Sequence, residues 1–220
     1  MEASVSAPRH MLIFPGAVPA PLCDKIVREG DKLVLEKAKV VSPTGGREDQ
    51  SRKRDTHIAR FMHEPQHQWL YDEAWSIVQQ LNAKNWNFEI NALEPPQYTV
   101  YGPHQFFGWH RDNAPYSVRK HQAQTELTRK ISISIQLSSD HEYQGGDFEV
   151  IQDETKGLPE DDFAPASHAF GPEVSKQMRQ KGTLLAFPAI FMHRVTPVLS
   201  GVRKALVVWG GGPPADFDDY

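Results

Sequence analysis

Four residues of this chain, His110, Asp112, His193 and Arg203, have types and spacing that suit iron chemistry. His110 and Asp112 are two positions apart, so on an extended strand their side chains leave the same face. With His193 from a later strand-like segment, they would supply two imidazoles and one carboxylate. That ligand set is typical of non-haem Fe(II) sites, which keep coordination positions open for oxygen chemistry. A guanidinium at Arg203, ten residues after His193, could grip the far carboxylate of a dicarboxylate cosubstrate.

The tripeptide from His110 to Asp112 is a weak signal by itself, because such sequences are common in surface turns. The later histidine and arginine, set within alternating apolar segments, make the metal site more specific. A cupin-type jelly-roll protein that binds Zn or Mn is one alternative, but it needs no carboxylate clamp at Arg203. A nucleic-acid demethylase with the same iron chemistry is another. It would require a basic groove and further arginines in the last strand, where only Arg203 and Lys204 occur.

The surrounding motifs resemble those of the 2-oxoglutarate- and Fe(II)-dependent dioxygenases, in particular the prolyl 4-hydroxylase-like group named PKHD-type hydroxylases. The resemblance covers roughly residues 95 to 210. The segments that carry it are, in chain order, Tyr101 to Pro103, Trp109 to Ala114, Arg129 to Leu137, Tyr143 to Phe148, Gly182 to Pro188, His193 to Val198 and Gly201 to Arg203.

The resemblance implies that His110, Asp112 and His193 hold Fe(II), with 2-oxoglutarate and O2 as cosubstrates and ascorbate as a candidate reductant. Arg203 would pair with the distal carboxylate of 2-oxoglutarate. Tyr101 would add a phenolic hydrogen bond, although a core tyrosine is the alternative for this residue. The implied reaction hydroxylates an amino-acid-like group and releases succinate and CO2. Peptidyl proline is the first candidate substrate, and a free amino acid or small metabolite is the second.

The pattern of apolar residues predicts helices first and strands later. Three- and four-residue spacing predicts helices over Leu22–Glu36 and Gln66–Leu81, although Gly30 weakens the first. Alternation and short apolar runs predict strands over residues 11–14, 86–90, 97–101, 131–135, 147–151, 183–187, 193–198 and 203–209. This order indicates an α+β protein built on a β-sandwich or jelly roll. The resemblance implies the more specific double-stranded β-helix, with supporting helices packed on one side.

Length and composition are those of an ordinary globular domain. The chain has 220 residues, of which 39% are hydrophobic and 24% charged, so we expect one domain over residues 1–220. Within it we expect a helical support over about residues 15–85 and a jelly-roll core over about residues 86–212. The net charge of −4 gives no electrostatic reason to expect a nucleic-acid partner.

Targeting features are few. No apolar run approaches the length that spans a membrane, and the first residues do not follow the pattern of a signal peptide. The single cysteine, Cys23, excludes a disulfide within the chain and fits a reducing compartment. We therefore expect a cytoplasmic protein without a membrane partner.

Two polar segments, Ser42–Arg60 and Gln152–Lys181, fit no regular element. Their ordinary role would be that of solvated connecting loops. The functional hypothesis is that both fold over a bound substrate, and their mixed charges favour a polar peptide or small molecule over a lipid. Neither the substrate itself nor the oligomeric state follows from the sequence.

Overall fold

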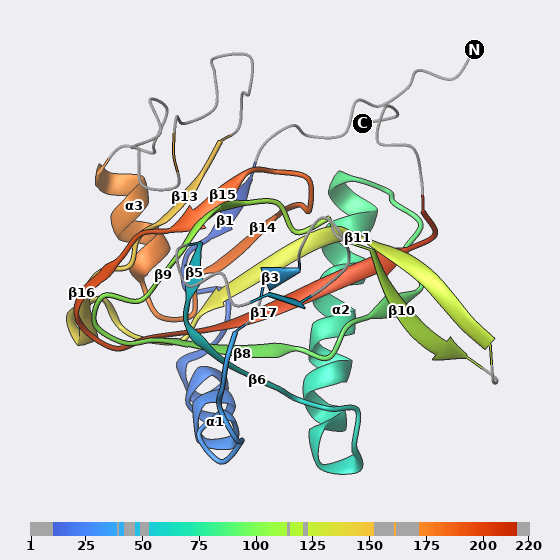
Figure 1. The fold of residues 1–220 in the computed structure, drawn as a ribbon, viewed down its shortest axis with the longest axis horizontal. Coiled ribbons are helices and arrows are strands. Elements are labelled where there is room, and N and C mark those ends of the chain that lie inside the picture. Colours follow the sequence, from blue (N-terminus) through green and yellow to red (C-terminus); the bar gives the residue numbers. More distant parts are fainter. Residues whose placement is uncertain are drawn as a thin grey trace.

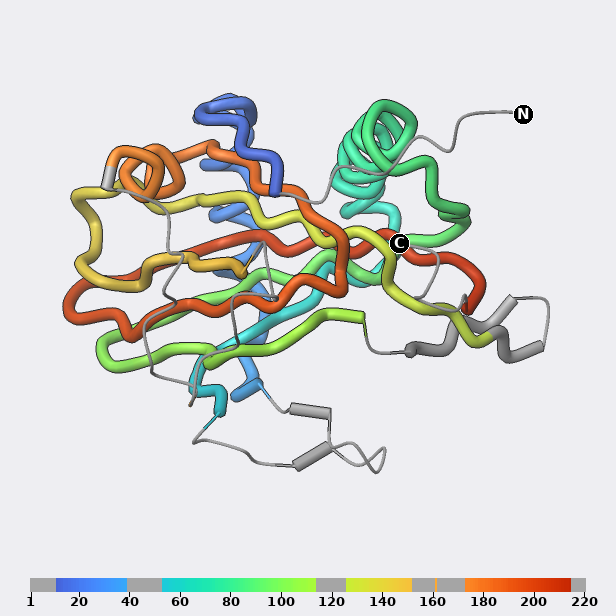
Figure 2. The backbone as a smooth tube through the Cα atoms, turned by 90° about the horizontal axis from the view of Figure 1, so that it is seen from above, coloured from blue at the N-terminus to red at the C-terminus, as the bar shows by residue number. Residues whose placement is uncertain are grey.

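The strands form two facing sheets, with helices on one side of them (Figures 1 and 2). The coordinates are those of a computed structural model, which describes residues 11–38, 40–41, 47–48, 53–113, 115–120, 123–151, 161 and 172–214. Within these residues no helix is long and apolar enough to cross a membrane.

The larger sheet has nine strands in the order β1-β14-β11-β17-β8-β6-β2, with β10 pairing with β11 and β7 with β17. Its strands are β1 (Leu12–Phe14), β2 (Glu36–Lys37), β6 (His57–Arg60), β7 (Ala92–Leu93), β8 (Gln97–Tyr101), β10 (Pro115–Lys120), β11 (Ala123–Gln136), β14 (Leu184–Pro188) and β17 (Arg203–Gly212). Neighbouring strands are antiparallel.

The smaller sheet has four antiparallel strands in the order β13-β15-β9-β5. They are β13 (Phe148–Val150), β15 (His193–Val195), β9 (Phe106–His110) and β5 (Arg54–Asp55). Two further strand pairs are β12 (Tyr143–Gly145) with β16 (Val198–Gly201) and β3 (Val40–Val41) with β4 (Arg47–Glu48). A short 3-10 helix, η2 (Asp140–Glu142), precedes β12. Two opposed antiparallel sheets make a double-stranded β-helix, so the predicted fold class is confirmed.

Helices α1 (Ala20–Gly30) and α2 (Gln68–Asn85) pack on the larger sheet. Pro21 lies in the first turn of α1, and Pro65 opens the 3-10 helix η1 (Pro65–His67) directly before α2. Proline is tolerated there because the first N–H groups of a helix have no partner within it. The third helix is α3 (Pro172–Arg179), and Figure 2 shows all three on the same side of the strands.

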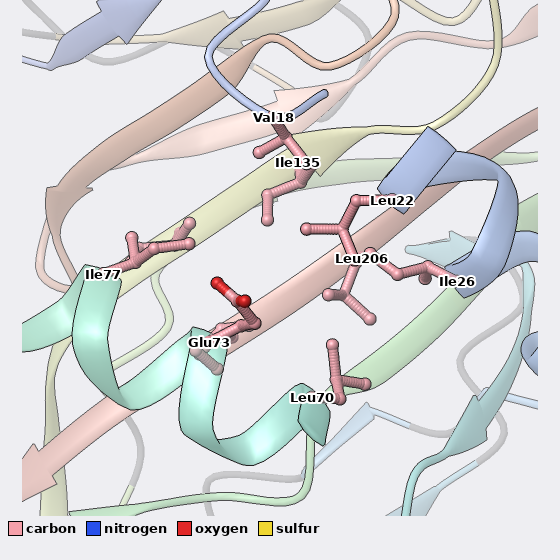
Figure 3. Close-up of a pocket in the computed structure, with 11 residues that line it drawn as sticks. Val18, Leu22, Ile26, Leu70, Glu73, Ile77, Ile135 and Leu206 are labelled. Carbon is pink, nitrogen blue, oxygen red and sulfur yellow. The ribbon is translucent and has the colours of Figure 1, made fainter. Parts of the chain in front are cut away.

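The interface between α1, α2 and the sheet is an apolar core. Ile26 of α1, Leu70 of α2 and Leu206 of β17 are each at most 2% exposed, and Figure 3 shows them converging on one small cavity. Its volume of about 20 Å³ is room for roughly one water molecule. The cavity is therefore a packing gap of the core and is too small for a substrate.

Strand β11 shows how the alternating pattern is used. Its three isoleucines, Ile131, Ile133 and Ile135, pack into the core beneath the helices. The intervening Ser132 and Ser134 leave the opposite face and are also buried, at 1% and 7% exposure. The polar face of this strand therefore does not face water; it lies between the sheets, where it can contact a functional site.

Gly30 ends α1 and allows the helix to approach the sheet closely. A Cβ atom at this position would lie 2.7 Å from two ring atoms of Tyr98. Tyr98 is fully buried on β8, and its hydroxyl donates to the carboxylate of Asp31 at 2.7 Å. The glycine that weakened the helix prediction is thus required by packing rather than by the conformation of the helix.

Some predicted elements need correction. The strand expected at residues 86–90 is irregular; Phe88 and Ile90 are instead partly buried against the core, and only Ala92–Leu93 pairs with β17. The supposed loop at residues 42–60 contains β4, β5 and β6, whose strand pairing the local sequence does not reveal. The loop expected at residues 152–181 contains α3, while residues 152–160 and 162–171 lie outside the described part of the chain.

Candidate active site

Pairing between β9 and β15 brings the two candidate histidines together. His193 lies opposite His110, with ring centroids 4.1 Å apart. Asp112 follows β9, and its backbone N–H donates to the carbonyl of Ala189 at 2.9 Å, which turns the chain back toward the larger sheet. One carboxylate oxygen lies 3.7 Å from Nε2 of His110 and the other 3.5 Å from Nε2 of His193. All three side chains therefore point at one location.

Hydrogen bonds orient both imidazoles. Nδ1 of His110 lies 2.8 Å from the carbonyl oxygen of Gly108, and Nδ1 of His193 lies 2.9 Å from that of Phe191. A carbonyl can only accept, so each Nδ1 carries a hydrogen and each Nε2, which faces the carboxylate, is the ring atom that can bind an ion. Burial, with the neighbouring His193, holds the pKa of His110 well below its ordinary value, so this ring is neutral at neutral pH.

Two buried side chains hold the carboxylate of Asp112. The hydroxyl of Ser132 donates to Oδ2 at 2.8 Å, and the indole N–H of Trp209 donates to the same oxygen at 2.9 Å. Ser132 and Trp209 are cross-strand partners on β11 and β17, so both reach the carboxylate from one face. Burial would raise the pKa of Asp112, but His193, His110, Arg129 and the Trp209 bond outweigh it and lower the pKa, so the group is ionised.

These three side chains fit a metal ion. Their ligand atoms lie within 4.8 Å of one another, and no other group of three or more metal-binding side chains comes together in this way within the described residues. The separations of 3.7 and 3.5 Å between the two Nε2 atoms and the carboxylate leave space for an ion between the three side chains. Two neutral imidazoles and one carboxylate suit Fe(II). With Oδ2 held by two donors, Oδ1 is the oxygen left for the ion.

Aromatic rings surround the two histidines. The ring of Phe107 stacks on His110 with centroids 3.4 Å apart, and Phe187 meets His193 edge-on at 4.8 Å. Phe148 adds a further contact to His193 at 5.5 Å. This wall excludes water from one side of the site and fixes the imidazole planes, as a site with open coordination positions requires.

Arg203 and Tyr101 lie side by side in the larger sheet. They are cross-strand partners on β17 and β8, and each is 4% exposed. The guanidinium carbon of Arg203 is 5.4 Å from the Tyr101 ring centroid. Burial raises the pKa of the Tyr101 hydroxyl, so it is protonated and able to donate. The two residues therefore present a cation and a hydroxyl within one buried region.

The structure adds three residues to those that the sequence suggested. Trp209 and Ser132 both orient Asp112. The sequence did carry a signal for both, since Ser132 lies on the polar face of an alternating strand and Trp209 shares the strand face of Arg203. Arg54 of β5 lies beside Phe107, but its segment reads as a charged loop, so nothing local singled it out. His104, six residues before His110, lies in the loop between β8 and β9 with φ of 67° and is not part of the metal-binding group.

Known proteins resemble this chain in sequence over the segment that carries the site. The family model of the 2OG-Fe(II) oxygenase superfamily matches residues 96–210, more than half of the chain. A PKHD-type hydroxylase of Shewanella baltica (strain OS155) is 34% identical over 115 residues, which are 52% of this chain and 42% of that relative. A PKHD-type hydroxylase of Burkholderia ambifaria (strain MC40-6) is 32% identical over 119 residues, 54% of this chain and 43% of the relative. The chain thus spans less than half the length of these curated relatives.

Solved structures share the fold. A Pseudomonas putida prolyl-4-hydroxylase superposes with a TM-score of 0.60 at 16% identity, covering 93% of both chains. A Trichoplax adhaerens prolyl hydroxylase, in complex with a hypoxia inducible factor oxygen degradation domain peptide fragment, gives 0.63 at 13% identity, covering 92% of this chain and 84% of that one.

The chain belongs to the 2OG-Fe(II) oxygenase superfamily. The curated relatives that it resembles over about half of its length are PKHD-type hydroxylases. The cofactor and cosubstrates of this superfamily are Fe(II), 2-oxoglutarate and O2, and the three side chains described above fit the iron. This membership decides against the cupin-type alternative.

Proposed function

We propose that this chain catalyses the Fe(II)- and 2-oxoglutarate-dependent hydroxylation of an amino-acid-like substrate, with peptidyl proline as the first candidate. The observation that carries the proposal is the convergence of His110, Asp112 and His193 in a buried site, with both Nε2 atoms facing the carboxylate. Support for a peptide comes from the Trichoplax adhaerens structure of the same fold, which holds a peptide fragment. When bound, Fe(II) with 2-oxoglutarate and O2 supplies oxidative decarboxylation to succinate and CO2, coupled to hydroxylation of a C–H bond.

The protein contributes position and charge. His110, Asp112 and His193 would hold the ion on one side and leave the opposite side to cosubstrate and oxygen. Ser132 and Trp209 keep the carboxylate in one orientation, so one oxygen is presented to the ion. The stacked Phe107 ring keeps water from the imidazole of His110.

Arg203 and Tyr101 would bind 2-oxoglutarate. Among the described residues the Arg203 side chain has no carboxylate partner, so its charge is available to the distal carboxylate of the cosubstrate through a two-pronged contact. The protonated hydroxyl of Tyr101 can donate to an oxygen of the same molecule. The cation and the hydroxyl would together fix the direction in which 2-oxoglutarate enters the site.

Succinate formation tests the proposal. Purified protein with Fe(II), 2-oxoglutarate and a prolyl peptide should form succinate and a product heavier by one oxygen atom. Asp112→Ala should lower both by at least about a hundredfold, because loss of one ligand dismantles the three-residue site. Asp140→Ala, on the exposed η2, is the matched control and should behave like the unmodified protein. Unchanged succinate formation by Asp112→Ala would refute the assignment, and omission of ascorbate would test the need for a reductant.

A further inference from the structure

Arg54 extends a stack of planar groups that ends at a candidate iron ligand. It lies on β5, the edge strand of the smaller sheet, opposite Phe107 of β9. Its guanidinium carbon is 4.2 Å from the centroid of the Phe107 ring, whose other stacking partner is the imidazole of His110 at 3.4 Å. The guanidinium is therefore separated from a ligand of the iron by a single aromatic ring.

Arg54 is partly buried and lacks the carboxylate partner that other arginines of the described residues have. Its Nε atom is fully buried without a hydrogen-bond acceptor. Neither Arg54 nor Arg203 has a carboxylate partner among the described residues. Three other arginines that are partly or fully buried are paired: Arg129 with Glu94, Arg179 with Asp147, and Arg194 with Glu149.

Leaving this cation unpaired costs stability. Burial lowers the pKa of Arg54, and Tyr101 and Asp112 oppose that effect. The guanidinium nevertheless stays protonated in any ordinary buffer. A charge that is desolvated and unpaired in the absence of ligand is typical of a binding site, where the missing partner arrives with the ligand.

A charge count indicates what that partner is. Fe(II) and the guanidiniums of Arg54 and Arg203 carry four positive charges, whereas Asp112 and 2-oxoglutarate carry three negative ones. One positive charge remains once the cosubstrate is bound. The nearby Arg129 and Arg194 are already neutralised by Glu94 and Glu149. A substrate with one negative charge near the reacting carbon would complete the balance.

We propose that Arg54 binds a carboxylate of the substrate, so that this site takes amino-acid-like acids rather than neutral groups. The carboxylate could be the free α-carboxylate of the target residue or an acidic side chain beside it in a peptide. This inference rests on the proposed function, since it names the substrate class of the same site. Arg203 lies on the opposite sheet, where it would bind the cosubstrate, so the two guanidiniums would bind two different anions.

Anaerobic binding to protein loaded with Fe(II) and 2-oxoglutarate tests the proposal without turnover. Two matched pairs of probes each differ by one charge. N-acetyl-L-proline and N-acetyl-L-prolinamide test the free carboxylate; N-acetyl-prolyl-aspartamide and N-acetyl-prolyl-asparaginamide test the side chain. Calorimetry should show at least one acid binding about tenfold or more tightly than its neutral counterpart, the amount expected of a charge-assisted contact.

Arg54→Gln should weaken the binding of that acid by roughly ten- to a hundredfold. The affinity for the neutral counterpart should change by no more than about twofold. Arg54→Lys keeps the charge and should retain part of the preference. Arg28→Gln removes the same charge from an exposed position on α1 and should change nothing. The thermal midpoint of Arg54→Gln should be equal or higher, because an unpaired buried charge is removed; this midpoint also establishes that the variant is folded.

Four results would overturn the proposal. Acids and neutral probes could bind equally well, or neither acid could bind at millimolar concentration. The preference for acids could survive in Arg54→Gln. Finally, Arg54→Gln could weaken the binding of 2-oxoglutarate instead, which would make Arg54 part of the cosubstrate site. The proposed function fails separately, since absence of succinate formation would refute it whatever the binding assay shows.

Discussion

The buried donors to Asp112 allow a quantitative test of how the iron site is built. Ser132→Ala removes one donor to Oδ2, and Trp209→Phe removes the other while it keeps an aromatic ring in the sheet. Neither residue is a candidate iron ligand. Their effect should therefore arise only through the orientation and basicity of the carboxylate.

The expected loss follows from the contacts. Asp112 is 7% exposed, so water does not replace a missing donor easily. Each bond joins a neutral donor to a charged oxygen, and such bonds contribute on the order of 1.5–3 kcal/mol. Each single variant should therefore weaken Fe(II) binding by roughly ten- to a hundredfold, within the range seen when groups that support metal ligands are removed. In the double variant the fold-loss of Fe(II) affinity should be smaller than the product of the two single losses, because both donors bind the same oxygen.

Metal affinity is the appropriate measurement. Anaerobic competition with a chromophoric chelator gives the Fe(II) dissociation constant, and succinate formation at saturating iron separates weak binding from poor geometry. Ser134→Ala is the matched control, because Ser134 is on the same face of β11, is similarly buried, and makes no contact to Asp112 that the structure records. Unchanged Fe(II) affinity in both Ser132→Ala and Trp209→Phe would refute the view that these donors position the carboxylate.

Two further predictions concern other parts of the molecule. Arg203→Lys keeps the charge but loses the planar fork, so the apparent constant for 2-oxoglutarate should rise roughly ten- to a hundredfold in a succinate assay; an unchanged curve would mean that Arg203 does not hold the cosubstrate. Gly30→Ala should lower the thermal midpoint, because the new Cβ would lie 2.7 Å from Tyr98 and the overlap, about 1–3 kcal/mol, exceeds the gain of about 1 kcal/mol in helix propensity. A midpoint equal to or above that of the unmodified protein would contradict the packing argument.

The sequence by itself determined the class of chemistry and the fold. His110 and Asp112 are neighbours in the chain, and short spacing on a strand is a local property that sequence reports well. Regular periodicity predicted α1, α2, β8 and β17 for the same reason, since burial of one face repeats along a single element. The end of α1 was predicted wrongly, because the helix stops at Gly30 and Glu36 begins strand β2. The family resemblance that the motifs carry then implied the double-stranded β-helix, which the structure confirms.

Tertiary structure decided which residues surround the site. Ser132, Trp209 and Arg54 come from three different strands, and only the pairing of those strands puts them near Asp112 or His110. The alternation of apolar and polar residues shows that the two faces of β11 differ. It does not show that the polar face is buried between two sheets. Segment 86–90 alternates like a strand yet finds no strand partner, because pairing depends on what lies beside it. The sequence does not distinguish an arginine in a solvated loop from one, such as Arg54, that packs inside the protein without a carboxylate partner. Burial depends on the whole fold and not on the neighbouring residues in the chain.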